Sequence, residues 1–105
     1  MAREYDKLVR DEIPAAIEAD GETPITHVAD DEEYERRLRE KLIEEAEEFA
    51  ESGEIEELAD VLAVVEAYRQ HADVPEGRLE VLRAEKAADR GGFEERIVLE
   101  RVEDQ

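Results

Sequence analysis

The chain has 105 residues, the size of a single domain, and 41% of them are hydrophobic, which is enough for a small core. It carries 33 acidic and 14 basic residues, a net charge of −19, and this balance argues against binding to the phosphate backbone of nucleic acids. The absence of cysteine excludes disulfides, thiolate metal sites and a thiol nucleophile. With no long apolar run, we expect one domain over residues 1–105, cytoplasmic and without a membrane partner.

The acidic residues are spread along the whole chain, and eleven of the 14 bases are arginine. This pattern is typical of a halophilic protein that works in molar salt, where the Debye length is about 3 Å. The alternative is an acidic protein that binds a basic partner.

Three short elements are predicted before the first long helix. "YDKLVR", residues 5–10, predicts a strand or an extended arm. Asp11 is a candidate N-cap for a short helix with Pro14 in its first turn, where proline is tolerated. "ITHVA", residues 25–29, alternates and contains β-branched residues, which favours a strand.

Helical periodicity dominates the rest of the chain. One helix is predicted from just after Asp30 or Asp31 to about Ser52, with Gly53 as its C-cap. Two more are predicted over about 54–72 and 76–89, and "RIVLERV", 96–102, predicts a final strand. Because short connections make neighbouring helices antiparallel, the fold class is mainly α. We expect an antiparallel helical bundle with short β elements from the N- and C-terminal segments.

The two long helices carry carboxylates on their apolar sides. At about 100° per residue, Glu45 falls within the stripe of Leu38, Leu42 and Phe49, and Glu48 lies on its flank. In the helix predicted over about 54–72, Glu57 and Asp60 flank an apolar face. This face consists of Ile55, Leu58, Val61, Leu62, Val65 and Tyr68.

A carboxylate on an apolar face is costly unless it is paired or holds a metal. The hairpin predicted at Gly53 would bring both pairs of carboxylates together. Oxygen ligands alone favour Mg²⁺, Mn²⁺ or Ca²⁺. The alternative is a wet bundle edge at which these acids pair with Arg or Lys.

These motifs resemble a known superfamily. Residues 44–48 read E-E-x-x-E and residues 57–60 read E-x-x-D, and together they resemble the signature of the all-α NTP pyrophosphatases, which include the MazG-like proteins and the phosphoribosyl-ATP pyrophosphohydrolases. The likeness to small MazG-like proteins covers nearly the whole chain, and its segments are "YDKLVRDEIP" at 5–14, "KLIEEAEEF" at 41–49, "EELADVLAVVEA" at 56–67 and "KAADRGGFEERIVL" at 86–99.

The resemblance implies a metal site and a homo-oligomer, either a dimer or a tetramer. Its Mg²⁺ or Mn²⁺ ligands would be Glu45, Glu48, Glu57 and Asp60. Glu44 would reach a second ion or act as a base, and Glu48 is the other candidate base.

A nucleotide approaching an acidic chain needs local cations. The candidates for binding the substrate are Lys7, Arg10, Lys41, Lys86 and Arg90. Lys41 could instead pair only with Glu45 at i+4, and Arg10 and Arg90 with surface acids. Gly91 and Gly92 permit either close approach of a phosphate or an ordinary helix C-cap.

These features predict a Mg²⁺-dependent hydrolase that splits a nucleoside triphosphate, of a non-canonical kind by resemblance, between its α and β phosphates. The products would be a monophosphate and pyrophosphate. Two alternatives stay open: hydrolysis of phosphoribosyl-ATP, and a non-catalytic acidic helical protein that binds a partner.

Overall fold

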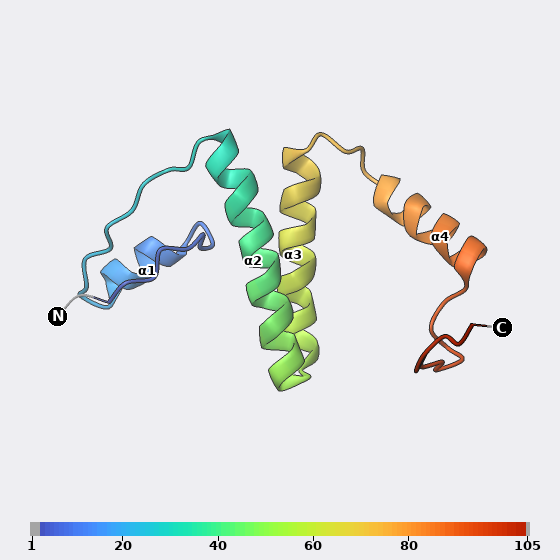
Figure 1. The fold of residues 1–105 in the computed structure, drawn as a ribbon. Helices are drawn as coiled ribbons and strands as arrows, with labels where there is room; N and C mark the ends of the chain where they lie inside the picture. The colour runs from blue at the N-terminus through green and yellow to red at the C-terminus, as the bar shows by residue number, and fades with distance from the viewer. Residues whose placement is uncertain (1–2, 105) are drawn as a thin grey trace. The chain divides into compact units, whose positions relative to one another are not determined.

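The computed structural model describes residues 3–104, which form four helices and no strand (Figure 1). The helices are α1 (Ile13–Ala19), α2 (Asp31–Ser52), α3 (Ile55–His71) and α4 (Arg78–Arg90). The mainly α class is therefore confirmed. The chain divides into two compact units, Met1–Asp73 and Val74–Gln105, so that α1 to α3 belong to the first and α4 to the second.

Local signals set the ends of α2. The side chain of Asp30 accepts a hydrogen bond from the Glu33 amide at 2.9 Å and caps the first turn. Gly53 ends the helix in a left-handed conformation (φ 67°), and its amide donates to the Phe49 carbonyl at 2.8 Å. Glycine adopts this conformation without steric cost, so the predicted C-cap is confirmed and α3 starts two residues later.

The predicted N-cap at Asp11 is wrong. Residues 10–13 form a turn in which the Ile13 amide donates to the Arg10 carbonyl at 3.1 Å. This turn takes up Asp11, and Glu12 becomes the residue that precedes α1, without a side-chain cap. Pro14 does lie in the first turn, as predicted.

The strands predicted at 25–29 and 96–102 are not formed within residues 3–104, and the segment 5–10 has no regular secondary structure. A strand is stable only when its backbone pairs with a neighbour. Ile25, Val28, Ile97 and Val98 are all exposed, so these segments also lack a packed face.

The first unit is centred on the packing of α2 against α3, which lie side by side (Figure 1). Leu38 of α2 is 1% exposed and Val64 of α3 is 9% exposed, and these two form the buried hydrophobic core of the described residues. The predicted apolar face of α3 is only partly correct, because Ile55 and Leu62 point outward and are 73% and 67% exposed. The helix is apolar on more sides than α2 covers.

Salt is expected to stabilise the fold. Most ion pairs on this surface are exposed and contribute little, whereas a net charge of −19 repels itself at low ionic strength. Raising KCl from about 0.1 M to about 2 M shortens the Debye length severalfold, and we expect the thermal midpoint to rise by about 5 °C or more. Circular dichroism at 222 nm measures this midpoint. A midpoint that falls with salt would show that the surface ion pairs dominate instead.

Candidate metal centre

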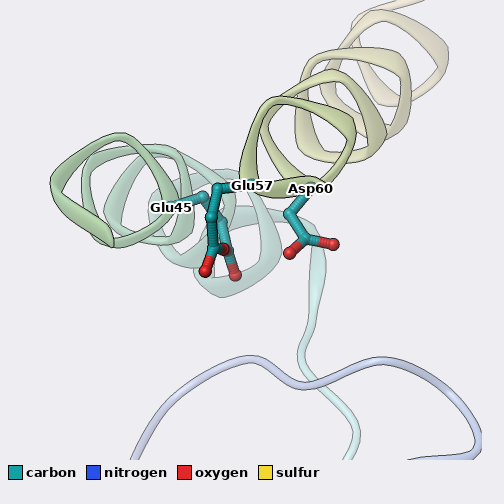
Figure 2. A group of neighbouring side chains, drawn as sticks. All are labelled: Glu45, Glu57 and Asp60. Atoms are coloured by element: carbon teal, nitrogen blue, oxygen red, sulfur yellow. The ribbon is translucent and has the colours of Figure 1, made fainter. Parts of the chain in front are cut away.

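Three carboxylates converge where α2 and α3 pack together. Glu45 comes from α2, whereas Glu57 and Asp60 come from successive turns of α3 (Figure 2). One oxygen from each lies within 4.8 Å of the others. We call these three residues the acid cluster. Their convergence was predicted from helical spacing, and it depends on the short break at Gly53.

The spacing of these oxygens suits a hard divalent cation. Two oxygens on opposite sides of Ca²⁺, at about 2.4 Å each, lie about 4.8 Å apart, and around Mg²⁺ about 4.2 Å. Because three oxygens cannot all lie opposite one another, the side chains would move slightly inward for one Ca²⁺ or Mg²⁺ to contact all three. The donor set, which contains only carboxylate oxygens, is the one that these ions prefer.

Glu45 is the member that needs a ligand most. It is 8% exposed, and its Oε2 is buried without a hydrogen-bond partner within residues 3–104. Its Oε1 lies 3.2 Å from Lys41 Nζ. A buried carboxylate with an unsatisfied oxygen is costly. A bound cation would satisfy this oxygen, so the residues fit the ion that the sequence predicts.

The acids around the cluster repel one another. A hydrogen bond that Glu48 can donate to Glu45 only when it is protonated, and then the charge of Glu45, raise the pKa of the exposed Glu48 above its usual range. Burial, and then the charges of Asp60 and Glu45, raise the pKa of Glu57. Glu48 thus lies beside the acid cluster, although its oxygens are not among the three that converge. A divalent cation would relieve this repulsion.

Glu44 has a different environment. It accepts hydrogen bonds from Lys7 at 2.8 Å and from Lys41 at 3.2 Å. The bond from Lys7 lowers the pKa of the Glu44 carboxyl. A lowered pKa weakens a general base, so of the two candidate bases the structure gives Glu48 the more suitable environment.

Three of the five candidate cations lie at this site. Lys7 and Lys41 pair with Glu44, and Arg10 Nη2 lies 2.8 Å from Asp60 Oδ1. Lys86 and Arg90 belong to the second unit, so their role at the site stays a prediction. Lys41 does pair with Glu45, as the alternative held, but it is shared with Glu44.

Sequence reasoning missed Arg37. This side chain is 14% exposed, and its two Nη atoms donate to the Asp6 carbonyl at 2.7 Å and to Asp6 Oδ1 at 2.8 Å. The two residues are 31 positions apart, and no local pattern links them. Arg37 also lines, with Lys7, Leu8 and Lys41 among others, a small cavity of about 40 Å³. This volume holds a water-sized group, whereas ligand pockets usually measure about 300–1,000 Å³.

Comparison with known proteins finds no family model, no curated protein and no solved structure that matches the chain. Among residues 3–104, no helix has both the length and the apolar character needed to cross a membrane.

Proposed function

We propose that the protein is a Mg²⁺-dependent nucleotide pyrophosphohydrolase of the MazG-like kind. One observation supports this more than any other: the buried, unsatisfied oxygen of Glu45 at the meeting point of three carboxylates. An acidic surface that served only for solubility would not bury such a group. The cations Lys7, Arg10 and Lys41 beside it are the complement that a polyphosphate requires.

In this proposal the acid cluster would hold the ion. When bound, Mg²⁺ would supply charge stabilisation at phosphate oxygens and lower the pKa of a coordinated water. Glu48, beside the cluster, would serve either as a fourth ligand or as the base that accepts a proton from the attacking water, since Lys7 and Lys41 hold the carboxylate of Glu44. The water oxygen bonds to the α phosphorus and the α–β bridge breaks. Lys7, Arg10 and Lys41 stabilise the charge on the departing pyrophosphate.

The substrate class and setting rest on the resemblance in sequence. We propose a non-canonical nucleoside triphosphate as substrate and a saline cytoplasm as setting. Phosphoribosyl-ATP is the second candidate substrate, since its hydrolysis uses the same bond cleavage and the same metal. A non-catalytic acidic protein is the remaining alternative, and the burial of Glu45 argues against it.

We also propose that the chain works as a homo-oligomer. Ile43 of α2 and Ile55 and Leu62 of α3 are 59%, 73% and 67% exposed on the α2–α3 hairpin. Large apolar side chains left exposed together mark a surface that a partner covers. A second copy of the chain is the partner that we propose.

The surface for this second copy lies on the α2–α3 hairpin. We define it as the apolar face, and its members are Leu42, Ile43, Ile55, Leu58 and Leu62, which are between 37% and 73% exposed. Leu38 marks the side of α2 that faces α3. At about 100° per residue around the helix axis, Leu42 lies to one side of Leu38 and Lys41 to the other. The apolar face therefore lies on the side of the hairpin away from the acid cluster. Two hairpins joined by this face would form a four-helix bundle.

Product analysis tests the proposed reaction. Purified protein in molar KCl with Mg²⁺ is incubated with canonical and modified nucleoside triphosphates and with phosphoribosyl-ATP, and the products are separated by ion-exchange chromatography. We expect a monophosphate and pyrophosphate from at least one triphosphate. Release of a diphosphate and phosphate would identify a different enzyme class. Turnover of phosphoribosyl-ATP alone would select the second candidate, and binding of Mg²⁺ without any turnover would support the non-catalytic alternative.

A further inference from the structure

The N-terminal arm, residues 3–12, is held to the hairpin by contacts at the site. Arg10 pairs with Asp60, a member of the acid cluster, at 2.8 Å, and Lys7 pairs with Glu44 at 2.8 Å. The partners are 50 and 37 positions apart in the chain. A cation of the arm therefore occupies a carboxylate that the proposed metal would need.

A second contact holds the arm without using the acid cluster. Asp6 has a left-handed backbone (φ 43°), a conformation that side chains rarely adopt, and Arg37 supports it with the two hydrogen bonds described above. The arm can therefore stay in place on α2 when Arg10 lets go of Asp60.

Arg10 and Lys7 differ in what a metal would do to them. Glu44, the partner of Lys7, lies outside the acid cluster, and it also accepts from Lys41, so its pairing is compatible with a bound ion. A divalent ion bound to Asp60 would repel the Arg10 guanidinium and compete with it for the same carboxylate oxygens. The Arg10 side chain is 63% exposed, so only its pairing with Asp60 and few packing contacts oppose its rotation.

We propose that Arg10 is an exchangeable counter-ion. Without metal it neutralises Asp60. When a divalent ion binds, Arg10 leaves Asp60 and turns to the phosphate groups of the metal's anionic ligand, which a guanidinium can bind with two hydrogen bonds. This inference rests on the proposed metal site. It assigns to Arg10 a binding role that changes with metal occupancy.

The proposal predicts two effects of opposite sign for Arg10→Gln. In this variant Mg²⁺ no longer competes with the Arg10 guanidinium for Asp60. The free energy of an exposed ion pair of this kind corresponds to a change of about two- to fivefold in a dissociation constant. We therefore expect the Kd for Mg²⁺ to fall by about threefold. The Kd of the Mg²⁺-loaded protein for pyrophosphate should rise by about tenfold, because charge-assisted hydrogen bonds are lost.

Isothermal titration calorimetry measures both constants on the full chain at fixed KCl concentration. Arg3→Gln is the matched control, because it removes the same charge from the same arm and pairs with Glu22 at 2.7 Å instead of the cluster. It should change each Kd by less than about twofold. Arg10→Lys keeps the positive charge but lacks the two parallel N–H donors of a guanidinium. Its Kd for Mg²⁺ should therefore equal the wild-type value, whereas its Kd for pyrophosphate should stay raised, as in Arg10→Gln.

The outcomes separate this inference from the proposed function. Suppose that the wild-type protein binds Mg²⁺ but that Arg10→Gln binds it with an equal or higher Kd. This result would overturn the exchange of Arg10 and would not contradict the metal site. A wild-type protein that binds no divalent ion would overturn the metal site itself. Should Arg10→Gln fail to fold by circular dichroism, Arg10→Lys decides, because wild-type affinity for pyrophosphate in that variant would exclude the exchange.

Discussion

Glu45→Gln is expected to abolish metal binding and to stabilise the metal-free protein at the same time. Substituting even a residue that only orients a metal ligand costs about 10- to 100-fold in affinity, so loss of a buried ligand should weaken Mg²⁺ binding by about 100-fold or more. Turnover should be lost in parallel. The metal-free protein should gain about 1 kcal/mol, since the new amide can donate to the neighbouring carboxylates and no buried charge remains unsatisfied.

Calorimetry gives the Mg²⁺ affinity, and urea unfolding in EDTA gives the free energy of unfolding. Glu47→Gln is the control, because it removes the same negative charge from an exposed position of α2 outside the acid cluster. It should change neither quantity strongly. A Glu45→Gln protein that keeps its Mg²⁺ affinity and loses stability would show that Glu45 serves only as an ion-pair partner of Lys41.

Leu62→Glu is expected to convert the proposed homo-oligomer to monomers. Leu62 is 67% exposed on the apolar face, and burying a carboxylate in its place would cost at least about 3 kcal/mol, which is about 100-fold in the association constant. The thermal midpoint should fall as well, because the exposed side of α3 would lose its cover. Sedimentation equilibrium in molar KCl measures the association.

Ala15→Glu on α1 is the matched control, since it adds the same charge at an exposed position outside the apolar face. It should leave the association constant unchanged. The apolar face would be excluded as the interface if Leu62→Glu associated as tightly as the wild-type protein. A wild-type chain that stays monomeric at the highest concentration measured would exclude the homo-oligomer.

Features that depend on neighbours in sequence were predictable. Asp30 caps α2 through the amide three residues on, and Gly53 ends it because glycine tolerates a left-handed backbone. The spacing of Glu57 and Asp60 places both on one face of α3 whatever surrounds the helix. Glu45 was predicted to turn inward with Leu38, and the structure buries both.

Features that depend on distant partners were not predictable. Alternation and β-branched residues predicted a strand at 25–29, and the run "RIVLERV" predicted one at 96–102. Pairing decides strands, however, and these segments remain unpaired within residues 3–104. The predicted N-cap at Asp11 is wrong for a local reason, because Asp11 lies inside the turn that the Ile13 amide and the Arg10 carbonyl close. The anchor between Asp6 and Arg37 has no local signature.

Sequence by itself determined the mainly α class, the course of α2 and α3, and the carboxylates that point toward their contact. These properties follow from periodicity and capping, which act over a few residues. Only the tertiary structure decided that three carboxylates meet within 4.8 Å and that Arg10 pairs with Asp60. It also decided that one oxygen of Glu45 has no hydrogen-bond partner among residues 3–104. Those properties depend on how α2, α3 and the N-terminal arm are placed relative to one another within the first unit. Tertiary packing sets this placement, and the local sequence pattern does not.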